Sequence, residues 1–211
     1  MTLIAYDIPA VGAALDRLIR ADAPSLTSLD LDGCRLGELG DVGIQTLLDA
    51  LQGNTHLRSL ECGSKEIKHS AALLTAVTGH ATLQHLGLAF NKVDVTRRRS
   101  FGIALSALLA AHPSALSSLD VAGCELSDEG LRPLVEALPG AAHLRILSCG
   151  FNGMTDGFTA SLLTAVRVNT SLRELWVVDD EDDEANQAIR TLAHAEAVVA
   201  ARQRSTRSAL R

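Results

Sequence analysis

The sequence predicts an α/β solenoid, a right-handed arc with parallel strands on its concave face and helices on its convex face. One observation is a leucine pattern that recurs at intervals of 31, 26, 33, 28 and 28 residues, beginning at Leu26, Leu57, Leu83, Leu116, Leu144 and Leu172. A second is the apolar stripe at helical spacing that follows each pattern and needs a neighbouring repeat to bury it. A third is that segments 27–36, 57–63 and 70–77 recur 90, 87 and 89 residues later, which indicates a duplicated block of three repeats.

The N-terminal segment is predicted to cap the array. Ile8, Val11, Leu15 and Leu18 have helical spacing and predict an amphipathic helix over residues 7–20. The letters TLIAY before it allow a vestigial strand. Residues 1–25 therefore form either a helical cap or a degenerate first repeat.

The segment from Leu116 to Leu147 is the clearest copy of the repeat. Leu116, Leu119, Val121 and Leu126, with Cys124 between the last two, follow the spacing L-x-x-L-x-L-x-x-N/C-x-L. This spacing predicts a short strand and a turn, and the apolar stripe after it predicts a helix. The N/C position is expected to be buried and to satisfy backbone groups of the turn; it is filled by Cys34, Asn91, Cys124 and Asn152.

Six such repeats are predicted over residues 26–180, and the pattern ends after Val177. Six acidic residues at 179–184 lead into a predicted capping helix over residues 181–204, with a flexible tail at 205–211. The acidic run lacks the glycine that an EF-hand calcium loop requires at its sixth position. We expect no metal site.

Composition narrows the classes of function. A formal net charge of -6 argues against general binding to nucleic acid, which needs a basic surface. The N-terminus does not resemble a secretory signal, and no apolar run reaches the length of a membrane span. We expect a cytoplasmic protein with no membrane partner.

Catalytic motifs are not evident. His85 is expected on the concave face with Ser59 and Ser118 on adjacent strands, but the sequence shows neither a third member nor an oxyanion loop for a Ser-His device. Phosphate loops, Rossmann fingerprints and nucleophile elbows are missing from the sequence. We therefore predict no enzyme activity, no small-molecule substrate and no cofactor.

The concave face is the predicted binding surface. Its first outward column is Ser28, Ser59, His85, Ser118, Ile146 and Glu174. The second is Asp30, Glu61, Gly87, Asp120, Ser148 and Trp176, and the third is Asp32, Gly63, Ala89, Ala122, Gly150 and Val178. The three columns hold five acids and no Lys or Arg, so we expect a protein partner with a basic surface. The predicted partner-binding residues are Asp30, Glu61, His85, Ser118, Asp120, Ile146, Glu174 and Trp176.

Two features leave alternatives open. Trp176, a residue type that interface hot spots favour, is either exposed for binding or covered by the C-terminal helix, and coverage is the preferred expectation. Arg97, Arg98 and Arg99 are expected in a loop of the third repeat, either as a solvated loop or as an RNA-binding one. The solvated loop is preferred because no aromatic residues are interleaved to stack on bases.

The segment CELSDEGLRPLVEALPGAAHLRIL resembles the ribonuclease-inhibitor subtype of leucine-rich repeats, and the resemblance covers about residues 26 to 178. The resemblance implies an α/β horseshoe that binds proteins on its concave side. Lys65 and Asp180, at the N/C position, and the uneven length of the first three repeats depart from the family pattern.

The favoured hypothesis is a non-enzymatic protein-binding module, with export into a host cell as a bacterial effector as one form of it. Relatives with this repeat include Ran GTPase-activating proteins, so regulation of a small GTPase by surface contact is an alternative. RNA binding through Arg97–Arg99 is the third hypothesis.

Overall fold

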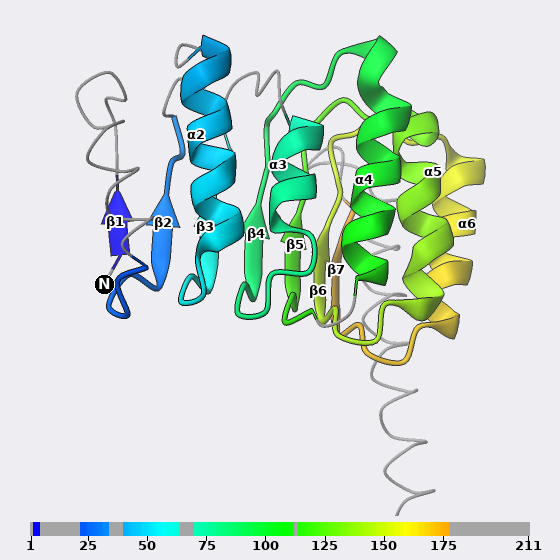
Figure 1. Cartoon of the computed structure of the whole chain (residues 1–211). Helices are drawn as coiled ribbons and strands as arrows, with labels where there is room; N and C mark the ends of the chain where they lie inside the picture. The colour runs from blue at the N-terminus through cyan, green and yellow to red at the C-terminus, as the bar shows by residue number, and fades with distance from the viewer. Residues whose placement is uncertain (1, 5–21, 34–39, 64–69, 112–113, 178–211) are drawn as a thin grey trace, which may run out of the picture.

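The computed structural model describes residues 2–4, 22–33, 40–63, 70–111 and 114–177 (Figure 1). The predicted helix over residues 7–20, the capping helix over 181–204 and the tail lie outside these residues. The described chain alternates strand and helix, and each strand lies beside the strand of the next repeat.

A single parallel sheet runs through the described part of the chain. Its strands pair in sequence order and are β1 Thr2–Ile4, β2 Ser28–Asp30, β3 Ser59–Glu61, β4 His85–Gly87, β5 Ser118–Asp120, β6 Ile146–Ser148 and β7 Glu174–Trp176. Strands β2 to β7 are the six that the leucine pattern predicts. The vestigial strand allowed at TLIAY is β1, whose Thr2 pairs with Ser28.

The helices all cover one face of this sheet (Figure 1). They are α2 Gly40–Gly53, α3 Ser70–Val77, α4 Arg98–Ala110, α5 Ser127–Ala137 and α6 Asp156–Val168, with short 3-10 turns η2 Val95–Arg97 and η3 Leu138–Gly140. Packed helices need 8–10 Å where paired strands need about 4.8 Å, so the array bends with the sheet on its inner, concave side. The predicted α/β solenoid is confirmed.

The core lies between the sheet and the helices and is built mainly from leucine. The central leucine is fully buried in five strands, at Leu29, Leu60, Leu86, Leu119 and Leu147. The predicted helical stripes supply the other side; in α5 they are Leu131, Leu134 and Val135. Each layer buries its apolar surface against its neighbours, so no repeat has a core of its own.

The described turns after β4, β5 and β6 each carry a buried residue at the N/C position, which is Asn91, Cys124 or Asn152. Asn152 Oδ1 accepts the N–H groups of Cys124 and Leu126, each at 3.1 Å, and its Nδ2 donates to the carbonyl oxygens of Val121 and Cys149. Asn91 Nδ2 donates to the carbonyl oxygens of Cys62 and Leu88. These bonds join consecutive repeats, which agrees with the role expected for this position.

Helix α5 begins without a side-chain cap, although Ser127 and Asp128 are cap-type residues at its start. The N-cap residue is Leu126, and it makes no side-chain cap bond. Asp128 instead accepts the N–H and the hydroxyl of Thr155 at 2.9 and 2.6 Å, in the turn before α6. The acid therefore ties one repeat to the next.

Helices α4 and α5 approach each other closely because each carries a buried glycine at the contact. A Cβ added at Gly102 would overlap the carbonyl oxygen of Gly130.

Among the described residues, no helix is both long enough and apolar enough to cross a membrane.

We predict that Gly102→Ala lowers the free energy of unfolding by about 1–3 kcal/mol, because the new methyl group would force α4 away from the Gly130 carbonyl. Urea denaturation of the purified chain measures this. Gly157→Ala is the matched control, since it is also a helical glycine but has no neighbour within 4 Å of the added Cβ. It should be neutral or stabilise by up to about 1 kcal/mol. Equal effects of the two substitutions would contradict the close helix contact.

Candidate functional site

The candidate site is the face of the sheet that no described helix covers, which we call the open face. Strand register aligns Ser28, Ser59, His85, Ser118, Ile146 and Glu174 in one row, and Asp30, Glu61, Gly87, Asp120, Ser148 and Trp176 in the next. These are the first and second columns predicted from the sequence. In β2, β3, β5 and β6 the outward residues are half-buried around a buried leucine.

Acidic side chains are concentrated on β2 to β5. Asp30 and Asp120 occupy the second column in equivalent turns, each accepting the backbone N–H two residues later at 2.9 Å. Asp32 accepts the N–H of Gly63 in the next repeat. None of the described column positions is Lys or Arg, so His85 is the one described column residue that can carry a positive charge near these carboxylates.

The pKa of Asp32 is raised above its ordinary value. Partial burial raises the pKa, and the nearby charges of Glu61, Asp30 and Asp120 raise it further, against the Gly63 hydrogen bond, which lowers it. A cation bound beside these groups would relieve the repulsion.

Glu61, His85 and Ser118 form a hydrogen-bonded chain across three strands. His85 Nε2 lies 2.5 Å from Glu61 Oε1, and His85 Nδ1 lies 2.9 Å from Ser118 Oγ. A neutral His85 that donates from Nε2 to Glu61 accepts the Ser118 hydroxyl at Nδ1, whereas a protonated ring donates at both nitrogens. The expectation that His85 and Ser118 have no third member is therefore wrong.

Gly87 makes this chain of contacts possible. Strand register places Gly87 directly opposite Glu61, and a Cβ at Gly87 would overlap the Glu61 carboxylate. The Glu61 side chain therefore lies over β4 and reaches diagonally to His85. Gly87, which lies between Glu61 and Asp120 in the second column, is the sequence signal for the contact between Glu61 and His85.

The arrangement of Glu61, His85 and Ser118 differs from a nucleophilic active site in one requirement. A nucleophilic serine needs N–H groups aimed at the developing oxyanion. Beside Ser118, the N–H groups of Ser117 and Ser118 both donate to the Gln84 carbonyl oxygen, at 2.8 and 2.9 Å. The N–H groups of Ser117 and Ser118 are thus already hydrogen-bonded within the sheet. They are not free to stabilise an oxyanion beside Ser118.

The C-terminal end of the open face carries two large apolar side chains beside one acid. Ile146 is half-buried, Glu174 is exposed, and the Trp176 side chain is 50% exposed. The helix expected to cover Trp176 lies outside the described residues. The open face thus carries most of its acids on β2–β5, whereas Ile146 and Trp176 add apolar surface beside Glu174 on β6–β7.

Two exposed aromatic side chains lie in the turns after β4 and β6, where the sequence pattern predicts only turns. Phe90 and Phe151 each precede the buried asparagine of their repeat, and they are 60% and 45% exposed. The repeated Phe-Asn pair was the available sequence signal for them.

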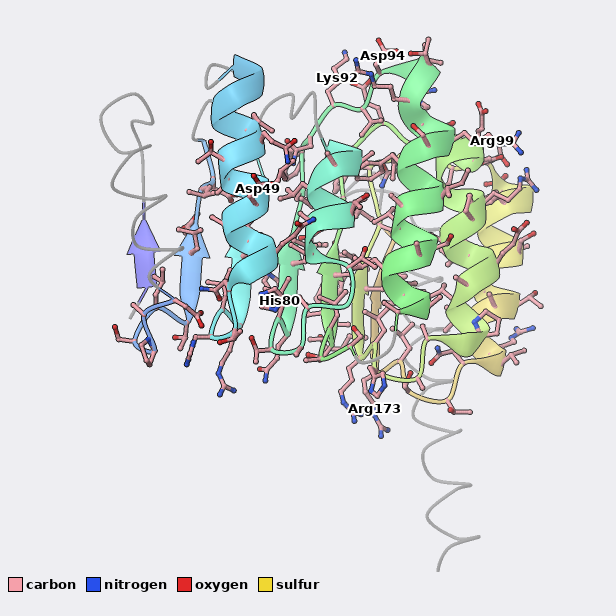
Figure 2. All side chains as sticks on the ribbon, viewed as in Figure 1. Asp49, His80, Lys92, Asp94, Arg99 and Arg173 are labelled. Atoms are coloured by element: carbon pink, nitrogen blue, oxygen red, sulfur yellow. The ribbon has the colours of Figure 1, made fainter. Side chains whose placement is uncertain are left out.

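The described arginines beside the sheet lie outside the columns, at the amino-terminal ends of strands. Arg58, Arg145 and Arg173 directly precede β3, β6 and β7 and are exposed, and Figure 2 shows Arg173 at that edge of the sheet. The loop expected at Arg97–Arg99 is wrong: Arg97 ends η2, and Arg98 and Arg99 begin α4. Arg98 is half-buried, and its Nε has no hydrogen-bond partner.

Groups of three or more His, Cys, Asp or Glu suited to a metal ion do not occur among the described residues. The thiols of Cys62, Cys124 and Cys149 are buried in the core, and burial raises the pKa of Cys124 to about 12. Such thiols are poor nucleophiles and poor metal ligands at neutral pH.

Comparison with known proteins identifies the repeats. Residues 25–47 and 112–135 each match a family model described as a leucine-rich repeat. The chain is therefore a leucine-rich repeat protein. The ribonuclease-inhibitor-like subtype remains a prediction.

Solved structures share the fold. The tropomodulin C-terminal domain from Caenorhabditis elegans is similar with a TM-score of 0.57 at 16% identity, over 77% of this chain and 98% of that one. Leiomodin-1 actin-binding site 2 is similar with a TM-score of 0.55 at 13% identity, over 94% of this chain and 95% of that one.

We predict that the pKa of His85 lies above 6.5, because the hydrogen bond to Glu61 raises the pKa more than burial lowers it. A folded-state pKa above the unfolded value stabilises the protein at low pH, and this contribution is lost as pH rises through the folded pKa. Histidine titration by NMR should give a lower pKa in Glu61→Gln, while Ser118→Ala should keep it raised.

The same substitution should also change the pH dependence of stability. The stability advantage of wild type over Glu61→Gln should be larger at pH 5.5 than at pH 9. An unchanged His85 pKa in Glu61→Gln would contradict the pairing.

Proposed function

We propose that the protein is a non-enzymatic binding module that holds a protein partner with a basic surface on its open face. The observation that carries the proposal is the charge distribution on the sheet: Asp30, Glu61 and Asp120 lie within four adjacent strands, with Asp32 in the turn after β2, and the outward columns there contain no Lys or Arg. Such a field speeds the approach of a basic partner and disfavours acidic ones.

The form of the surface supports a protein rather than a small molecule. The strands present a row of half-buried side chains along a continuous sheet, with apolar residues at one end and acids at the other. Protein interfaces combine apolar anchors with a polar surround in this way. The similar leiomodin-1 structure carries the name of an actin-binding site, so a related solenoid supports the same class of function.

RNA binding through Arg97–Arg99 has less support than the sequence suggested. Arg98 is half-buried in α4, so the three residues do not form a basic loop. Regulation of a small GTPase by surface contact is one special case of the proposed function, and a stimulated GTP-hydrolysis assay tests it.

The experiment compares two variants that change charge equally. The test variant carries Asp30→Lys, Glu61→Lys and Asp120→Lys on the open face. The control carries Asp49→Lys, Glu129→Lys and Glu136→Lys, which change exposed acids on the helices; Figure 2 shows Asp49 on α2. Both variants should remain folded by circular dichroism.

We expect proteins captured from lysate by wild type to be basic and to be lost at least about tenfold with the open-face variant, because each lost contact between opposite charges becomes a repulsion. Quantitative mass spectrometry measures the capture, and the helix variant should retain it. Equal loss with both variants, or none with either, would show that the open face is not the binding surface.

A further inference from the structure

We propose that His85 makes the binding of a basic partner to the open face depend on pH, so that the face binds more tightly when His85 is neutral than when it is protonated. The inference rests on the proposed function and adds a mode of regulation to the same surface. It depends on the position of His85 among the acids, on the contacts of its two ring nitrogens and on the space above Gly87.

His85 lies in the middle of the acidic part of the open face. Strand β4 pairs with β3 and β5, which places His85 between Ser59 and Ser118 in the first column. The hydrogen bond to Glu61 on β3 raises the pKa of the ring, burial lowers it, and the charges of Glu61 and of Asp120 on β5 raise it further. No described helix covers this face (Figure 1), and the His85 side chain is 32% exposed, so both protons and a partner can reach the ring.

The charge state of His85 determines how much of the Glu61 charge a partner meets. His85 Nε2 lies 2.5 Å from Glu61 Oε1. A protonated ring forms an ion pair with this carboxylate, and the two groups together carry no net charge. A neutral ring leaves the carboxylate with its full negative charge. Loss of the proton from His85 therefore adds one unit of negative charge to the open face.

The second contact of the ring is compatible with both charge states. His85 Nδ1 lies 2.9 Å from Ser118 Oγ. A hydroxyl group can donate to a neutral Nδ1 and can accept from a protonated one. The ring can therefore gain or lose its proton without giving up either hydrogen bond.

Gly87 places this change of charge where a cation of the partner would lie. The Glu61 carboxylate lies over Gly87, where a Cβ would overlap it, and Gly87 pairs with Asp120 on the next strand. The Glu61 carboxylate and Asp120 are therefore neighbours, since paired strands are about 4.8 Å apart. A Lys or Arg side chain that contacts both carboxylates lies close to the His85 ring, and a protonated ring repels it.

The affinity for a basic partner is expected to rise with pH. The hydrogen bond to Glu61 keeps the pKa of His85 above 6.5, and the ring loses its proton as the pH increases through that pKa. One unit of charge beside a bound cation in a solvent-exposed site changes the affinity roughly threefold to tenfold. The effect is reciprocal, so a bound cation must lower the pKa of His85 by the same free energy.

The test measures the affinity of the full chain for a basic probe at several pH values. The probe is a rhodamine-labelled hexaarginine peptide with an amidated C-terminus, because arginine stays protonated throughout this range. Anisotropy titrations at constant low ionic strength should give a dissociation constant for wild type that falls roughly threefold to tenfold between pH 6 and pH 9. Circular dichroism at both pH values checks that each protein remains folded.

Three variants identify the group responsible. His85→Gln keeps every carboxylate of the open face and carries no charge at position 85, so at pH 6 it should bind the peptide as tightly as wild type does at pH 9. Glu61→Gln should bind more weakly, with the midpoint of its affinity change at lower pH, because His85 loses the partner that raises its pKa. His143→Gln is the matched control, since it removes an exposed histidine in the turn before β6 and should keep the wild-type pH dependence.

The outcomes separate this inference from the proposed function. A constant affinity in wild type, or the same pH dependence in wild type and His85→Gln, would overturn the role of His85. In either case the proposed function stands if the peptide binds to wild type and is lost with the Asp30, Glu61 and Asp120 charge reversal. Unchanged binding in that reversal variant, or no binding to wild type, would overturn the acidic open face and this inference with it.

Discussion

The fold depends on turns such as those after β4, β5 and β6, in which buried side chains and neighbouring repeats satisfy the backbone groups. Asn152 accepts from two N–H groups of the preceding repeat and donates to carbonyl oxygens in that repeat and in its own. In the preceding repeat Cys124 fills the same position and its Sγ donates to the Leu88 carbonyl oxygen at 3.1 Å. Since buried backbone groups without partners cost several kcal/mol, these contacts fix the register of the strands.

Fixed register has a direct consequence for binding. Every second side chain of each short strand must face away from the helices, and the parallel pairing aligns these side chains in columns. The residues of the open face are therefore positioned by core leucines and turn asparagines rather than by one another. This leaves their chemistry adjustable, so acids, a histidine and exposed apolar residues share one rigid surface.

The sequence predicted the columns because leucine spacing determines which residues face outward. It did not predict the Glu61–His85 contact, which runs diagonally and depends on Gly87 leaving space above β4. The helical placement of Arg98 depends on the start of α4, which apolar periodicity does not locate. The sequence marks Phe90 and Phe151 only by their repeated Phe-Asn pair, and their exposure depends on a left-handed backbone that this pair does not specify.

We propose above all that a partner binds on the open face of the sheet. Amide chemical shifts of the isotopically labelled chain, followed during titration with a Lys-rich peptide at low salt, test it most directly. We predict that the largest changes fall on β2 to β5, around Asp30, Glu61, His85 and Asp120, with little change along the solvent-facing sides of α2 to α6. Shifts concentrated on the helices, or spread evenly over the surface, would contradict it.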